Sequence, residues 1–131
     1  AATAKGSALA AADVIEAITV SANTVVMFAG AEITTAPAGG NGCTFDLGIT
    51  GGDVDAFVDG MTVTGASVGD YGTLANTACP ILVTTSDTID MLLIGTTPDT
   101  SGKIRVYAML MEVDSIGSNK AADEVDRDLL A

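Results

Sequence analysis

The chain has 131 residues, 48% of them hydrophobic and only 4% aromatic, and its 17 acidic and 5 basic side chains give a net charge of -12. This length fits one domain with a sizeable core, and the apolar content argues against disorder. The negative charge disfavours nucleic acid and anionic lipid as partners, and no apolar run approaches the ~20 residues of a membrane-spanning helix.

The N-terminal part of the chain predicts an arm followed by short strands. Residues 1–12 are small and loosely patterned, which is typical of an arm. Residues 14–20 fit either a strand or a helical turn, and we favour the strand. Residues 24–29 and 32–35 are each rich in β-forming side chains, and Gly30 between them predicts a break.

Residues 43–49 carry the clearest strand pattern of the chain. Apolar side chains alternate with small or polar ones along this segment. The apolar set is Cys43, Phe45, Leu47 and Ile49, and the other set is Thr44, Asp46 and Gly48. Because successive side chains of a strand point to opposite faces, the pattern predicts a half-buried strand with one face in the core and one in water.

The glycine-bordered segment 51–60 interrupts the strand pattern. Three apolar side chains follow Asp53 at helical spacing, and Asp53 is a suitable N-cap. The pattern predicts a one-turn helix or an ordered loop in which Phe57 closes one end of the core. Strand character returns at residues 61–64, and residues 65–77 predict a long polar loop.

The last third of the chain predicts three strands joined in sequence. Residues 81–85, 89–94 and 103–113 are apolar or β-branched, with a turn at Ser86-Asp87 and a longer one over residues 96–102. Consecutive strands with short turns favour a three-stranded antiparallel meander.

The final strand differs from the others because its second half is apolar on both faces. Ile104, Val106, Ala108 and Leu110 form one face. On the other face Lys103 and Arg105 are followed by Tyr107, Met109 and Met111. Either the strand is central and covered on both sides, or Tyr107, Met109 and Met111 contact another subunit.

The C-terminal residues 117–131 change character and predict an acidic arm or a short amphipathic helix. Ala122, Val125 and Leu129 recur at helical spacing among acidic side chains. An isolated helix of about a dozen residues is marginal in water, so order requires docking on its own domain or on a neighbour. We therefore include Val125 and Leu129 among the predicted interface residues.

The sequence offers little for catalysis. It contains no histidine, which removes the usual Ser-His-Asp and Cys-His nucleophiles and the imidazole metal ligands. Cys43 and Cys79 lie too far apart for a CxxC site, and we expect two buried thiols, although spacing alone leaves a disulfide open. We predict a protein without enzymatic activity and without a cofactor.

One cluster of aspartates has the charge and hardness of calcium ligands. Asp53, Asp55 and Asp59 lie within the glycine-bordered loop. An EF-hand loop would continue with glycine and glutamate where this chain has Val58 and Thr64. We expect solvated carboxylates here and keep the three aspartates as weak metal candidates.

The strand and turn pattern predicts an all-β domain over residues 13–116, an antiparallel β-sandwich of jelly-roll type.

Four stretches of the chain are similar to a known family of proteins: Phe45-Asp-Leu-Gly48, the segment 52–60, Asp87-Thr-Ile-Asp90 and the segment 102–114. In these glycine and strand patterns the chain resembles the small β-sandwich decoration or cement proteins of tailed bacteriophage capsids.

The resemblance implies a jelly-roll-like subunit, often trimeric, that binds the major capsid protein lattice on the virion surface after synthesis in the host cytoplasm. The resemblance does not assign a binding role to any individual residue of this chain. A tail or head-fibre component, or a minor capsid subunit, is the second structural hypothesis. A calcium- or carbohydrate-binding β-sandwich module is the hypothesis from another class.

Overall fold

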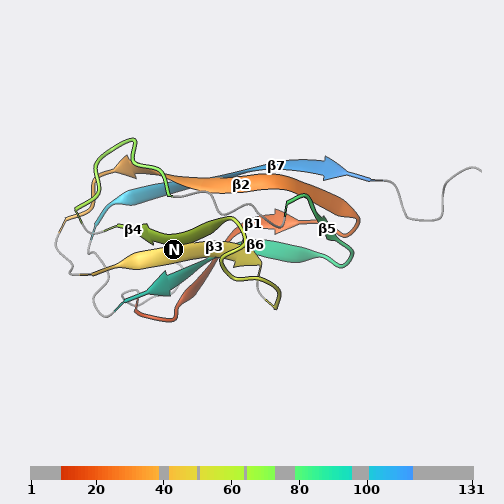
Figure 1. Ribbon diagram of the computed structural model, residues 1–131, viewed down its shortest axis with the longest axis horizontal. Helices are drawn as coiled ribbons and strands as arrows, with labels where there is room; N and C mark the ends of the chain where they lie inside the picture. The colour runs from red at the N-terminus through yellow and green to blue at the C-terminus, as the bar shows by residue number, and fades with distance from the viewer. Residues whose placement is uncertain are drawn as a thin grey trace, which may run out of the picture.

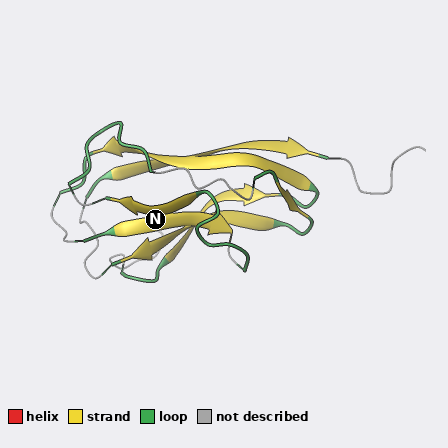
Figure 2. Ribbon diagram, in the orientation of Figure 1, coloured by secondary structure: helices red, strands yellow, loops and turns green. Residues whose placement is uncertain are grey.

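Two antiparallel sheets pack face to face in the computed structural model and form a β-sandwich (Figure 1, Figure 2). The model describes residues 10–38, 42–49, 51–63, 65–72, 79–95 and 101–113. Sheet A has the strand order β1-β6-β3-β4 and sheet B the order β5-β2-β7. The strands are β1 (Val14–Val20), β2 (Thr24–Thr35), β3 (Thr44–Ile49), β4 (Val58–Thr62), β5 (Ile81–Val83), β6 (Asp87–Ile94) and β7 (Lys103–Glu112).

The predicted all-β sandwich is therefore confirmed, and so is the strand at residues 14–20, which is β1. A complete jelly roll has eight strands in two sheets of four. The described residues supply seven strands, divided four and three. Sheet B is thus the narrower layer.

The core fills the space between the sheets and is built from alternate strand positions. Phe45 and Leu47 of β3 are both fully buried, as their spacing predicts, and Val26 and Ile33 of β2 face them from sheet B. Burying side chains of this size contributes roughly 1.5–3 kcal/mol each to stability. Phe57 is also fully buried, as expected, although its segment forms turns and bends rather than a helix.

The prediction that β3 has one wet face is wrong. Asp46 and Gly48 on its outer side are buried because the chain after β3 folds back over them. A Cβ placed on Gly48 would overlap the backbone carbonyl of Asp53. The Ile49 N–H donates to the Asp53 carbonyl at 3.0 Å, and the Gly60 N–H donates to Asp46 Oδ1 at 2.8 Å. Glycine at 48 is what permits this close approach.

The predicted break at Gly30 is also wrong, because β2 runs without interruption from Thr24 to Thr35. Gly30 lies opposite Tyr107 of β7 and keeps its place in the ladder. The irregularities of this ladder fall elsewhere, between Val26 and Phe28 and between Ile33 and Thr35. The glycine removes a side chain from the sheet without ending the strand.

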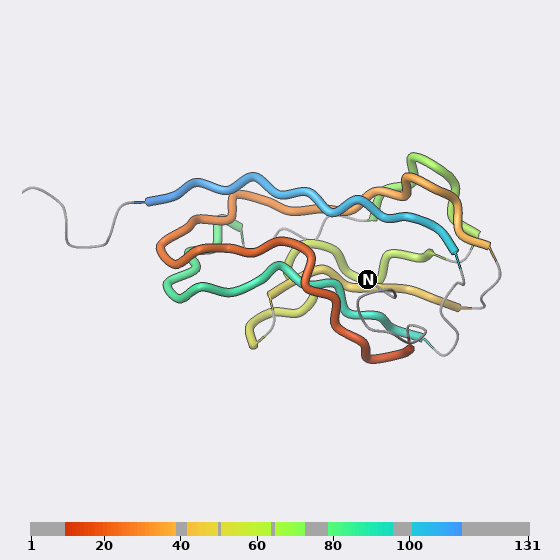
Figure 3. Tube along the Cα trace, turned by 180° about the vertical axis from the view of Figure 1, so that it is seen from behind, coloured from red at the N-terminus to blue at the C-terminus, as the bar shows by residue number. Residues whose placement is uncertain are grey.

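The predicted meander is wrong as well. β6 lies in sheet A between β1 and β3, whereas β5 and β7 flank β2 in sheet B, so the three last strands do not pair with one another. The linker 84–86 crosses between the sheets, which lets Val83 and Ile89 both face the core. It lies beside the crossing after β1, where the Ala22 N–H donates to Ser86 Oγ at 3.2 Å (Figure 3).

Most of the two predicted terminal segments lies outside the described residues, namely residues 1–9 and 114–131. The last residues of the N-terminal arm are described and attach to β6. The Ala12 N–H donates to the Leu93 carbonyl at 2.8 Å, and the Leu93 N–H donates to the Asp13 carbonyl at 2.9 Å. At the other end, the Val113 N–H donates to the Asn23 carbonyl at 2.9 Å and fixes the end of β7.

The burial of Phe45 generates a stability prediction. Phe45→Ala removes a fully enclosed ring and should lower the free energy of unfolding by about 3–5 kcal/mol in urea denaturation. The control is Val14→Ala, which alters a half-exposed β1 side chain and should stay within about 0.5 kcal/mol. Equal, small losses from both variants would contradict the assigned core.

Candidate interaction surface

The outer side of sheet B carries an unusual concentration of apolar side chains. β2 buries Val26, Ala29, Ala31 and Ile33 against sheet A. Residues that alternate with these point outward, and residues directly opposite one another in a ladder share a face. We define the apolar face as Val25, Phe28, Leu82, Tyr107, Met109 and Met111.

The strand register places these six residues next to one another. Val25 of β2 lies between Leu82 of β5 and Met111 of β7, and Phe28 lies opposite Met109. Met109 and Met111 are 53% and 50% exposed. The face therefore continues across all three strands of sheet B, and its two methionines are largely open to solvent.

Tyr107 closes one side of the apolar face. It lies opposite Gly30 in the ladder, and it forms an edge-to-face contact with Phe28 at 6.5 Å between centroids and 71° between planes. Burial raises the pKa of the Tyr107 phenol above 10.0, with smaller contributions from Tyr71 and Glu32. The loop residue Tyr71 forms an isolated antiparallel β-bridge with Glu32 of β2.

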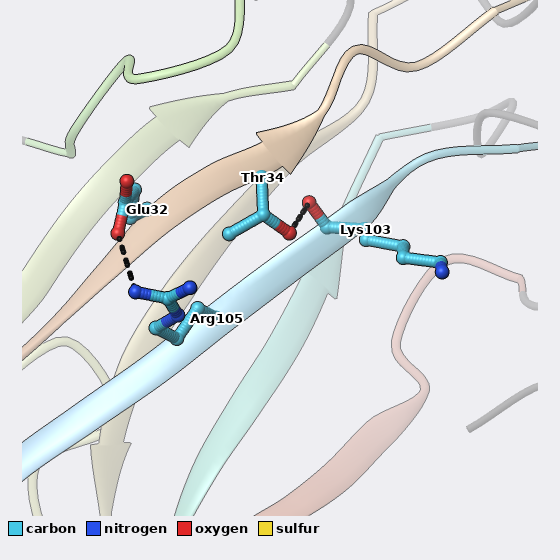
Figure 4. Close-up of polar contacts among 4 residues, drawn as sticks. All are labelled: Glu32, Thr34, Lys103 and Arg105. Carbon is cyan, nitrogen blue, oxygen red and sulfur yellow. Dashed lines mark hydrogen bonds and ion pairs between the residues drawn. The ribbon is translucent and has the colours of Figure 1, made fainter.

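Beyond Tyr107 the same side of sheet B becomes polar (Figure 4). Arg105 Nη1 lies 3.5 Å from Glu32 Oε2, and Thr34 Oγ1 donates to the Lys103 carbonyl at 3.2 Å. Lys103 and Arg105 are the basic residues of the described part of the chain. The outer side of sheet B thus has an apolar end and a cationic end.

The position of β7 rules out one of the two arrangements that the sequence left open. β7 is an edge strand of sheet B, and the outer side of its second half is exposed. It is therefore not a central strand covered on both sides. An edge strand that is long and apolar is itself prone to pairing with another chain, and the charged side chains of β7 lie outside residues 106–111.

The outer side of sheet A carries both carboxylates and apolar side chains. Val14 of β1 lies in the row of Asp46 of β3 and is 51% exposed. Asp90 of β6 lies in one row with Glu16 of β1 and Gly48 of β3, and Asp46 is close by on the same side. Asp46 and Asp90 are buried, whereas Glu16 is exposed. The two outer sides of the sandwich therefore differ, because that of sheet A mixes apolar and acidic side chains, whereas that of sheet B has an apolar end and a cationic end.

The three weak metal candidates lie in the loop that covers β3. Asp53 and Asp59 are exposed and Asp55 is half-buried. The pKa of the Asp55 carboxyl is raised above its ordinary value of 3.8, first by a hydrogen bond with the Asp53 side chain and then by the Asp53 charge. Among the described residues no group of three or more acidic, cysteine or histidine side chains is arranged to hold a metal ion.

An open pocket of about 410 Å³ lies between β5 and the loop after β3. Ile49, Ala56 and Val83 contribute apolar atoms to it, and Asp53 and Asp87 contribute carboxylates. Its lining residues include no aromatic ring, so it lacks the stacking platform with which proteins usually bind sugars. The lining of this pocket therefore does not favour it as a carbohydrate site.

Cys43 and Cys79 are thiols rather than halves of a disulfide. Cys43 is buried, as predicted, and Cys79 is half-buried. Burial raises the pKa of the Cys79 thiol above 9.0. A raised pKa lowers the thiolate fraction, so Cys79 is not an activated nucleophile.

Comparison with known protein families, with characterised proteins and with solved structures finds no match for this chain. In the described part of the chain no helix is long and apolar enough to cross a membrane. The function is therefore inferred from the surface of the molecule.

The sequence pattern of β7 predicted three residues of the apolar face, and the other three were not predicted. Val25, Phe28 and Leu82 join Tyr107, Met109 and Met111 only through the pairing of β2 with β5 and β7. The unbroken apolar run that follows Thr24 was a usable signal for an apolar outer side. In a strand with one face in water, apolar and polar residues would alternate. Val125 and Leu129 lie outside the described residues.

The carboxylate pair gives a pH prediction. Because the pKa of Asp55 is raised in the folded protein, the pair opposes folding at neutral pH, and this penalty decreases as pH falls through the folded pKa. Asp53→Asn should lower the Asp55 pKa toward 3.8 in an NMR titration of its carboxyl carbon. The control is Asp87→Asn, which should leave it unchanged; an unaltered pKa in Asp53→Asn would contradict the pairing.

Proposed function

We propose that this protein is a non-enzymatic structural subunit of a phage virion, which decorates and stabilises the capsid as a homo-oligomer bound to the major capsid protein. The observation that carries the proposal is the apolar face of sheet B. A two-layer sandwich can bury only one side of each sheet in its own core. Exposed apolar patches of this kind usually mark interfaces.

The composition of the apolar face supports a protein partner. Tyrosine, phenylalanine and methionine are enriched at the centres of protein interfaces, and charged residues are depleted there. The apolar face has aromatic and methionine side chains in its middle, and the Glu32–Arg105 pair lies outside it, beyond Tyr107. Contact with another copy covers it without a further component.

Exposed carboxylates away from sheet B support a second, different contact. With sheet B occupied by a neighbouring subunit, Glu16 of β1 and the loop carboxylates of Asp53 and Asp59 stay accessible. Carboxylates here favour a basic surface on the capsid lattice and keep the free subunits soluble. The likeness to decoration proteins points in the same direction, with a trimer as the expected state.

The oligomer gives the first prediction of this function. Met109→Lys places a charge in the proposed contact and should weaken subunit association by roughly 25-fold or more, since a hot-spot residue contributes at least about 2 kcal/mol. Light scattering over a concentration series measures the shift. Val14→Lys is the matched control, because Val14 is 51% exposed, like Met109, but lies on sheet A.

Two results would contradict this part of the proposal. One is a monomer at all concentrations for the unchanged protein. The other is an oligomer that Met109→Lys and Val14→Lys affect equally, because the apolar face would then have no special part in association.

Capsid binding gives the second prediction. The purified protein should bind bare capsids saturably, at a fixed number of copies per capsid protein, and the affinity should fall as salt rises because exposed charges are screened. Cosedimentation with quantitative mass spectrometry measures both. Absence of saturable binding at low salt would contradict the decoration role and favour the fibre or tail hypothesis.

A further inference from the structure

The apolar face has the dimensions of a short helix. Tyr107 and Met111 are four residues apart on one strand, which is about 13 Å at ~3.3 Å per residue. Across the three strands the face is about 10 Å wide, since neighbouring strands lie ~4.8 Å apart. A helix about 10 Å in diameter and three turns long covers such an area as a third layer.

The chain contains one segment with matching properties, residues 121–130. As a helix it would be about 15 Å long, with Val125 and Leu129 about 6 Å apart along its axis. Met109 and Met111 are separated by about 6.6 Å along β7. The segment is too short to be a stable helix alone and needs an apolar surface to dock on.

The charges of the two partners are complementary. Residues 121–130 carry four carboxylates and one arginine. Lys103 and Arg105 adjoin the apolar face, and the Arg105 side chain is 67% exposed even beside Glu32. A docked acidic helix would gain charge-assisted contacts at this end.

We propose that residues 121–130 of one copy dock as a helix on the apolar face of the next copy, with Val125 and Leu129 against Met109 and Met111. This inference rests on the proposed self-assembly and names its contact. Residues 114–120 connect this segment to the fixed end of β7 and span up to about 24 Å. Since the helix and the face are different surfaces, the contact is heterologous, and in the proposed trimer each copy gives one helix and receives one around a closed ring.

Disulfide trapping between full-length chains tests the proposal. Two chains with tags of different size, both carrying Cys79→Ser, are co-expressed, one with Met109→Cys and the other with Val125→Cys. Mild oxidation should join the two tags in one band on a non-reducing gel, at least 10-fold more than in the control pair Val14→Cys with Val125→Cys. Val14 is as exposed as Met109 but lies on sheet A.

Two results would overturn the proposal. One is a disulfide that forms only within a chain carrying both Met109→Cys and Val125→Cys, because the segment would then cover its own domain. The other is an oligomer in light scattering whose trapping yield is no higher than that of the Val14 control. That second result leaves the proposed function standing, whereas a protein that is monomeric throughout removes both.

Discussion

The constraint on which the rest depends is that a two-layer sandwich has only one buried side for each sheet. In sheet B the inner positions of β2 are fully buried, and the outer positions at one end of β2, β5 and β7 are also apolar. In sheet A the loop after β3 folds back over Gly48 and Asp46 and so covers part of the outer side within the chain. The described residues provide no such cover for sheet B, and this difference motivates a subunit contact as the third layer.

The sequence predicted which side chains face the core better than it predicted which strands are neighbours. Alternation alone placed Phe45 and Leu47 together in the core, because side-chain direction in a strand is a local property. Pairing is not local. The linker 84–86 could form a hairpin or cross between the sheets, and burial of both Val83 and Ile89 fits the crossing.

The same distinction explains which part of the candidate surface could be predicted. The periodicity of a single strand was sufficient to predict that Tyr107, Met109 and Met111 share one apolar side. Their partners on β2 and β5 come from distant parts of the chain, and Gly30, which predicted a break, instead pairs with Tyr107 inside the ladder. The cover over β3 depends on the absence of one Cβ at Gly48, a steric detail that composition does not reveal.

The central claim is that the outer side of sheet B is a buried contact in the assembled protein, and oxidative footprinting tests it most directly. Hydroxyl radicals should oxidise Met109 and Met111 readily in subunits diluted to the monomer, because both are about half exposed. In the purified homo-oligomer, without capsids, we predict at least a several-fold slower oxidation of both, with Val14 on sheet A unchanged between the two states. Equal oxidation of Met109 and Met111 in free and assembled protein would contradict the account.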